Sequence, residues 1–203
     1  MTNDDEAARH RAKMAKRKAV QDAEVAGKTV EKGLLLVHTG PGKGKSTAAF
    51  GLLLRAVGRG RRAAVVQFIK GAWTTGERAA LQRFPDLVEW HSMGEGFTWE
   101  TQDRARDIAA AQAGWEKAKQ LIADESLRMV VLDEINIALR YDYLAIADVV
   151  DFLKTSKPPM THVVLTGRNA KEELIEIADL VTEMTLIKHP FRSGIKAQAG
   201  VEF

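Results

Sequence analysis

Short apolar runs and longer amphipathic stretches alternate along most of the chain. The runs have the length of strands and are bounded by turn residues, whereas the stretches between them carry apolar residues at helical spacing. This pattern predicts strands at residues 33–38, 63–69, 87–91, 129–132, 162–166 and 181–187. It predicts helices at residues 46–57, 77–84, 101–123, 143–154 and 171–178. Continuous apolar strands separated by helices are typical of a parallel sheet that is buried on both faces. We therefore predict an α/β fold with a mostly parallel sheet and helices on both faces.

Residues 1–32 lack this pattern. Basic, acidic and alanine residues mix there, with almost no large apolar side chains to bury. The composition favours a helix intrinsically, but such a helix would have no stripe that faces a core. We expect residues 1–32 to form a basic N-terminal arm that is mobile and partly disordered, or that orders over the active site or a partner subunit. Residues 33–203 are expected to form a single domain.

The composition narrows the class of protein. The 203 residues are enough for one well-buried domain, and 45% hydrophobic with 28% charged residues is ordinary for a globular protein. The chain has no cysteine, which excludes disulfides and thiolate metal sites. A formal net charge of +3 does not indicate nucleic-acid binding. No apolar run approaches the roughly 18 residues of a membrane span, and the start has no apolar signal-type segment, so we expect a cytoplasmic protein without membrane or nucleic-acid partners.

A glycine-rich segment, residues 39–47, lies between the first predicted strand and the first predicted helix. Glycines allow backbone N–H groups to curl around phosphate oxygens, and the start of a helix favours an anion. Lys45 is expected to neutralise phosphate charge, and Ser46 to bind Mg²⁺. The residues predicted to hold a nucleotide are Thr39, Gly40, Pro41, Gly42, Lys43, Gly44, Lys45, Ser46 and Thr47. Two of them are unusual: Thr39 stands where the standard pattern has glycine, and Lys43 adds a second cation.

Two acidic residues, Asp133 and Glu134, follow the apolar strand predicted at residues 129–132. In P-loop proteins a carboxylate at the end of a neighbouring strand holds Mg²⁺, directly or through water. We predict a metal-binding role for this pair, and the spacing alone leaves open which of the two contacts the metal. In a hydrolytic ATPase, Glu134 would be the base that activates water.

Phe97 and Trp99 lie in a segment flanked by glycines, just before the long predicted helix. From the pattern alone, hydrophobic packing and a role in a site are both open. At this point the chain resembles the P-loop type of corrinoid adenosyltransferases, the cob(I)alamin or cob(I)yrinic acid a,c-diamide adenosyltransferase family. The resemblance rests on several stretches in the same order along the chain: residues 39–47, 65–71, 96–101, 130–134, 141–143, 165–168 and 196–200.

The resemblance implies a RecA-like P-loop NTPase fold with an unusual reaction. Co(I) of a reduced corrinoid attacks C5′ of ATP in cobalamin biosynthesis or salvage, and tripolyphosphate is released. Family members bind ATP reversed along the loop, with Mg²⁺ or Mn²⁺. Lys45 would then stabilise the leaving group, and Glu134 would be a metal ligand rather than a base. Phe97 and Trp99 match positions that displace the lower axial ligand of cobalt. The resemblance also implies a homodimer and an electron donor, either a flavodoxin-like protein or reduced flavin.

Two other functions remain open on the residues alone. A hydrolytic RecA-like ATPase would use the same loop and acids, but it gives no role to the aromatic segment. A nucleic-acid-binding module would use the basic arm, but the small net charge gives it little support.

Overall fold

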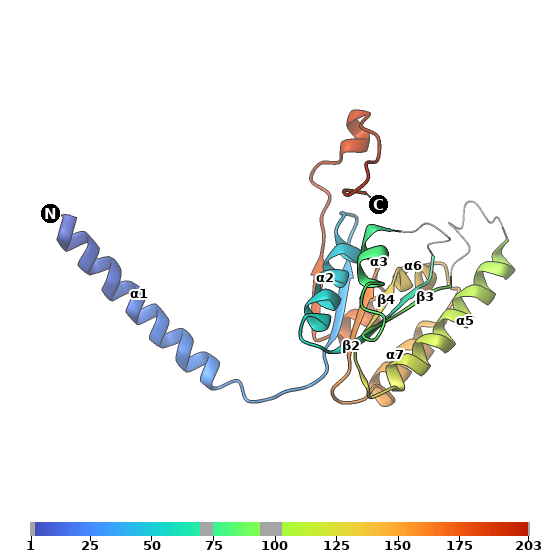
Figure 1. The fold of residues 1–203 in the computed structure, drawn as a ribbon, viewed down its shortest axis with the longest axis horizontal. Helices are drawn as coiled ribbons and strands as arrows, with labels where there is room; N and C mark the ends of the chain where they lie inside the picture. The colour runs from blue at the N-terminus through green and yellow to red at the C-terminus, as the bar shows by residue number, and fades with distance from the viewer. Residues whose placement is uncertain (1–2, 70–74, 94–102, 203) are drawn as a thin grey trace. The chain divides into compact units, whose positions relative to one another are not determined.

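The computed structural model describes residues 3–69, 75–93 and 103–202. The chain divides into two units, Met1–Glu31 and Lys32–Phe203. The first unit contains a single helix, α1 (Asn3–Ala26), drawn in blue in Figure 1. Its described side chains are almost all exposed. This part of the arm is helical because alanines and long charged residues are strong helix formers and need no core.

The second unit is built on a six-stranded sheet in the order β3-β2-β4-β5-β1-β6. Every neighbouring pair of strands is parallel, which confirms the α/β prediction (Figure 1). The strands are β1 (Leu35–Thr39), β2 (Arg62–Gln67), β3 (Val88–Ser92), β4 (Leu127–Asp133), β5 (His162–Thr166) and β6 (Leu180–Glu183). Parallel strands all end at the same edge of the sheet, so the segments that follow β1, β4 and β5 meet there.

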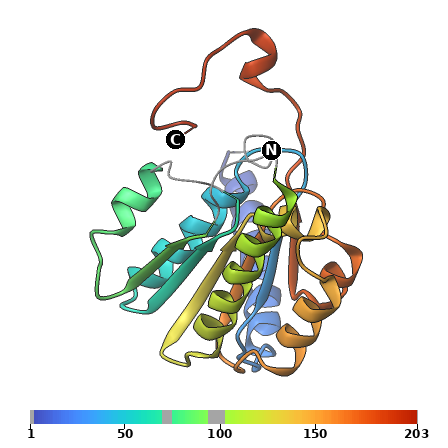
Figure 2. The same ribbon diagram turned by 90° about the vertical axis from the view of Figure 1, so that its right-hand side faces the viewer.

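Helices cover both faces of the sheet, and Figure 2 shows the two layers. Alternate strand residues point to opposite faces, so neighbours such as Val130 and Val131 belong to different core clusters. One face packs against α2 (Lys45–Val57) and α3 (Gly76–Leu81). The other face packs against α5 (Arg104–Ala123), α6 (Ile135–Arg140), α7 (Ile146–Thr155) and α8 (Glu172–Ile177).

Three elements differ from the sequence prediction. Helix α6 was not predicted, because its six residues directly follow β4 and give no full helical period. The helix expected at 143–154 begins only at Ile146, since Tyr143 and Leu144 are buried in the connection before it. The last strand is shorter than expected, and the chain beyond it forms a 3-10 turn, η1 (Pro190–Ser193), within an exposed tail.

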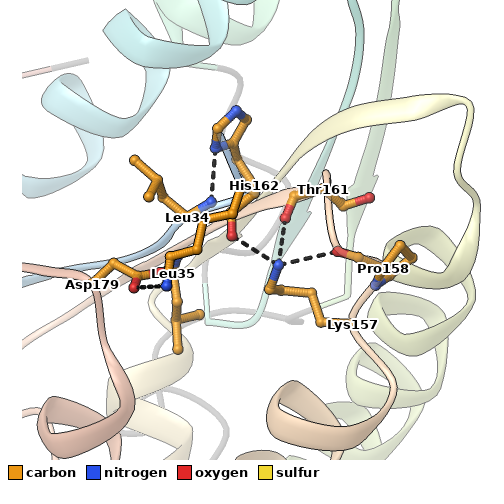
Figure 3. Close-up of polar contacts among 9 residues, drawn as sticks. Leu34, Leu35, Lys157, Pro158, Thr161, His162 and Asp179 are labelled. Carbon is orange, nitrogen blue, oxygen red and sulfur yellow. Dashed lines mark hydrogen bonds and ion pairs between the residues drawn. The ribbon is translucent and has the colours of Figure 1, made fainter. Parts of the chain in front are cut away.

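The start of β1 is held by side chains from segments far away in sequence (Figure 3). Nδ1 of His162 accepts a hydrogen bond from the backbone N–H of Leu34 at 3.0 Å, and Oδ2 of Asp179 accepts one from Leu35 at 2.9 Å. Burial lowers the pKa of His162, and the nearby Arg128 and Lys157 lower it further. Neutral His162 can accept at Nδ1, whereas the protonated ring would have two donors and lose this bond.

Lys157 binds backbone carbonyls at the same end of the sheet. Its ammonium group donates to three backbone carbonyls, those of Gly33 at 2.9 Å, Thr161 at 3.0 Å and Pro158 at 3.1 Å. Burial lowers the pKa of Lys157, while the carboxylate of Asp179 opposes this shift. Together these contacts anchor the beginning of β1, and the other end of the same strand leads into the glycine-rich loop.

Within residues 3–69, 75–93 and 103–202, no helix combines the length and the apolar character needed to cross a bilayer.

Candidate active site

The glycine-rich loop connects the end of β1 with the start of α2, as the sequence predicted. Gly44 precedes the helix with φ 102°, and Gly40 has φ 96°, both in the left-handed region that favours glycine. The loop also lies against the chain that follows β6. The N–H of Gly42 donates to the carbonyl of Met184 at 2.6 Å. A Cβ added to Gly40 would lie 2.5 Å from that carbonyl oxygen, so a larger residue has no room there.

Thr39, which replaces a glycine of the standard pattern, has a structural role. Its side chain is buried, and its hydroxyl accepts a hydrogen bond from the backbone N–H of Ala170 at 3.0 Å. Ala170 lies in the connection after β5, so the hydroxyl ties the start of the loop to the neighbouring strand's end. The departure from the pattern therefore stabilises the loop rather than interrupting it.

Lys45 is the first residue of α2 and is only 6% exposed. Its ammonium group donates to the carbonyls of Gly40 at 2.9 Å and Gly42 at 2.5 Å, which keeps it inside the loop. Burial is the main reason why the pKa of Lys45 lies below its ordinary value of 10.5. The carboxylate of Glu134 opposes this shift, and Arg168 and Lys43 add to it. The ammonium group of Lys45 is thus held inside the loop, where it can bind an anionic ligand such as a phosphate.

A cleft of about 540 Å³ opens beside the loop. It joins the predicted loop residues from Gly42 to Thr47 with residues of three other regions. These are α3 and its N-cap at Thr75, Gly76, Glu77 and Ala80, the segments after two strands at Glu134 and Arg168, and the tail at Gly200, Val201 and Glu202. Most of the predicted binding residues are therefore brought together. Thr39, Gly40 and Pro41 do not line this cleft.

The two predicted metal-binding acids occupy different places. Asp133 is fully buried, and its carboxylate accepts hydrogen bonds from the hydroxyl of Thr166 at 2.8 Å and from Nε2 of Gln67 at 3.0 Å. Glu134, the next residue, lines the cleft. Its backbone has φ 62°, and its N–H donates to the same Thr166 hydroxyl at 2.9 Å. Asp133 and Thr166 thus set the backbone position from which Glu134 reaches the cleft.

The contacts of Asp133 extend across the sheet to β3. Oε1 of Gln67 accepts hydrogen bonds from Nε1 of Trp90 at 3.0 Å and from the hydroxyl of Ser92 at 3.2 Å. Both ends of the Gln67 amide are therefore used, one toward β3 and one toward the carboxylate of Asp133. The buried carboxylate is stabilised by neutral donors on strands at either side of it.

The donor set at the cleft suits a hard divalent cation. Ser46 supplies a hydroxyl oxygen and Glu134 a carboxylate oxygen, and both line the cleft. Mg²⁺ prefers oxygen ligands and usually keeps several waters together with phosphate oxygens. Within the part of the chain that the structure describes, no group of three or more His, Cys, Asp or Glu side chains is placed to hold a metal by itself. The residues therefore fit a metal that binds together with a phosphate ligand.

Comparison with known proteins identifies the family. The model of the ATP:corrinoid adenosyltransferase BtuR/CobO/CobP family matches residues 31–203, and the Cob(I)alamin adenosyltransferase N terminal model matches residues 1–25. The chain belongs to the ATP:corrinoid adenosyltransferase family. It is 67% identical to a corrinoid adenosyltransferase of Sinorhizobium sp over 197 residues, covering 97% of this chain and 92% of the relative. It is 57% identical to a corrinoid adenosyltransferase of Pseudomonas aeruginosa, with 96% of each chain covered. Identity to the corrinoid adenosyltransferase CobA of Salmonella typhimurium is 45%, over 96% of this chain and 98% of the relative.

The aromatic residues that carried much of the resemblance to the adenosyltransferases, Phe97 and Trp99, lie outside the described residues. Their proposed role therefore stays a prediction.

Eight residues that line the cleft were not predicted as site residues: Thr75, Gly76, Glu77, Ala80, Arg168, Gly200, Val201 and Glu202. Two of them are charged and interact with lysines of the loop. Arg168 follows β5, and Glu202 lies in the tail. Arg168 could have been suspected, because it follows a predicted strand and falls within a stretch that resembles the family. Glu202 had no local signal, since its approach to the loop depends on the path of the tail.

Proposed function

We propose that this chain transfers the adenosyl group of ATP to the cobalt of a reduced corrinoid, in the biosynthesis or salvage of cobalamin. Co(I) attacks C5′ of ATP, so that a cobalt–carbon bond forms and the bond from C5′ to the phosphate oxygen breaks. The electron pair of the broken bond leaves with tripolyphosphate. No general base is needed, because Co(I) is itself the nucleophile. The observation that carries this proposal is the cleft, which joins the phosphate loop with Glu134 in a chain of this family.

The loop residues act on the leaving group. Lys45, Lys43 and the loop N–H groups stabilise the negative charge that develops on tripolyphosphate as the bond breaks. Ser46 and Glu134 would hold Mg²⁺ or Mn²⁺, and the bound ion would supply further positive charge to stabilise the leaving group. We assign Asp133 a positioning role instead, because its buried carboxylate already accepts two hydrogen bonds from neighbouring strands. We further infer that ATP lies reversed along the loop compared with typical kinases.

The corrinoid side of the site completes the proposal. Phe97 and Trp99 displace the lower axial ligand of cobalt, and the resulting four-coordinate centre accepts an electron more readily. The electron comes from a flavodoxin-like protein or reduced flavin. The protein acts as a homodimer, in which the basic residues 1–32 order over the active site. The Cob(I)alamin adenosyltransferase N terminal model matches residues 1–25, which indicates that this arm is a feature of the family.

A hydrolytic RecA-like ATPase would use the same cleft, with Glu134 activating water. The two reactions differ in their products, so phosphorus NMR separates them. The protein is incubated with ATP, Mg²⁺ and chemically reduced cob(I)alamin, and we expect tripolyphosphate together with adenosylcobalamin. Formation of ADP and phosphate without any need for corrinoid would overturn the proposal.

A matched pair of variants connects this reaction to the cleft. Lys45→Met should lower kcat about 10²- to 10³-fold, the usual cost of losing one group that stabilises developing charge. Lys154→Met is the control, because Lys154 is exposed on α7 and does not line the cleft. Equal activity of the two variants would contradict the role given to Lys45.

A further inference from the structure

The C-terminal tail returns to the phosphate-loop cleft. After β6 the chain leaves the sheet, passes through η1 and turns back, so that its end lies on the side of the phosphate loop (Figures 1 and 2). Gly200, Val201 and Glu202 then form part of the cleft wall. The tail therefore adds a wall to a cleft otherwise built from the phosphate loop, the strand ends and the region of α3.

A tight turn directs Glu202 into this position. The N–H groups of Val201 and Glu202 both donate to the carbonyl of Gln198, at 3.1 and 2.9 Å. Gly200, which precedes both residues, has φ 80°, a conformation that glycine adopts without strain. The turn brings Oε2 of Glu202 into an ion pair with Nζ of Lys43 in the phosphate loop. The side chain of Glu202 is only 16% exposed, although it belongs to an otherwise exposed tail.

The charges around the cleft explain why this contact matters. Its lining includes three cationic side chains, Lys43, Lys45 and Arg168. It also includes three anionic ones, Glu77, Glu134 and Glu202, which balance them. A triphosphate carries several negative charges and needs the loop cations unopposed, yet Glu202 already occupies the ammonium group of Lys43. A carboxylate and a phosphate oxygen compete for the same donor, since both are anionic acceptors.

We propose that Glu202 is an intramolecular competitor of the triphosphate for Lys43. It leaves Lys43 when ATP binds and pairs with it again when tripolyphosphate departs, so the tail opens and closes once in each turnover. The product keeps all the phosphate charge of the substrate, and Glu202 helps to release it by replacing it at one of its cationic contacts. This inference rests on the proposed function, because it takes the bound anion to be the leaving group of that reaction.

The direct test is calorimetric binding of inorganic tripolyphosphate, with Mg²⁺ and without ATP or corrinoid. Glu202→Gln keeps the size of the side chain and removes its charge, so it should bind tripolyphosphate about 2- to 5-fold more tightly than the wild type. This range corresponds to a partly exposed ion pair. Glu176→Gln, an exposed residue on α8, is the matched control and should bind like the wild type. Binding by Glu202→Gln that is unchanged or weaker would overturn the proposal.

A double-mutant cycle shows whether the effect passes through Lys43. In a Lys43→Met background, the substitution Glu202→Gln should no longer change the affinity for tripolyphosphate. A tightening that persists in this background would also overturn the proposal, because it would reflect the general charge of the tail. The increase in tripolyphosphate affinity caused by Glu202→Gln should become smaller as the salt concentration rises, since exposed charges are screened. The tests are independent of adenosyl transfer. If Glu202→Gln binds tripolyphosphate like the wild type and the protein transfers the adenosyl group, only the inference about Glu202 is wrong. If Glu202→Gln binds more tightly as expected but the protein releases only ADP and phosphate, only the proposed function is wrong.

Discussion

Thr166 offers the sharpest test of how the sheet supports the cleft. Its hydroxyl donates to the buried carboxylate of Asp133 at 2.8 Å and accepts from the N–H of Glu134 at 2.9 Å. Thr166→Val keeps the shape and removes both bonds. A hydrogen bond to a charged group contributes about 1.5–3 kcal/mol, and an N–H left without a partner costs about 1–3 kcal/mol. Both Thr166 and Asp133 are fully buried, so water cannot replace the hydroxyl without rearrangement. We expect a loss of roughly 3–5 kcal/mol in the free energy of unfolding.

The assay is urea denaturation of the two unliganded proteins, with a control on the same stretch of chain. Thr161 lies just before β5 and is also buried, but its hydroxyl makes a single, long bond of 3.4 Å to the carbonyl of Leu127. Thr161→Val should therefore cost about 1 kcal/mol or less. Equal losses in the two variants would refute the reasoning, because the cost would then come from replacing a buried threonine rather than from the contacts of Asp133 and Glu134.

Three further predictions, with four substitutions, concern other parts of the molecule. Gly167→Ala should cost about 1–3 kcal/mol of stability, because Gly167 has φ 128°. It should also weaken ATP binding measured by calorimetry, because an added Cβ would lie 3.2 Å from Oε2 of Glu134. Unaltered ATP binding would contradict a tight fit between Gly167 and Glu134. The pKa of His162 lies below 6.5 because of burial, so the unfolded chain takes up the proton more readily. Stability should fall as pH drops below 6.5 toward the folded-state pKa, and denaturation curves of His162→Gln should lack that part of the pH dependence. Phe97→Ala and Trp99→Ala should impair adenosylation that starts from Co(II) far more than adenosylation of pre-reduced Co(I), and equal loss in the two assays would remove the role proposed for these aromatics.

The fold could be predicted largely from local pattern. All six strands were anticipated. The strands β1, β2, β4 and β5 are mostly buried, and buried parallel strands are continuous apolar runs that can be recognised without their neighbours. The edge strands β3 and β6 are half-buried and exposed, respectively. The order β3-β2-β4-β5-β1-β6 was not, since it depends on how crossovers return to the sheet. Helix α6 was missed because six residues after a strand carry too little periodicity.

The candidate site divides in the same way. Lys45, Ser46, Gly42 and Gly44 belong to one local motif, and the structure brings all four to the cleft as its spacing predicted. Their roles in binding nucleotide and metal stay predictions. The sequence could not separate Asp133 from Glu134, because their different exposure arises from the left-handed backbone of Glu134. The contact between Lys43 and Glu202 joins positions at opposite ends of the domain, and only the folded path of the tail brings them together.

The amide of Gln67 has a consequence for how related chains can diverge. It donates to Asp133 on one side and accepts from Trp90 and Ser92 on the other, so its two ends are not interchangeable. A carboxylate at position 67 would place two acceptors face to face in the middle of the sheet. Replacing Asp133 by asparagine at the same time would provide a donor again. Positions 67 and 133 should therefore covary among homologous sequences, even though neither side chain is proposed to contact a substrate.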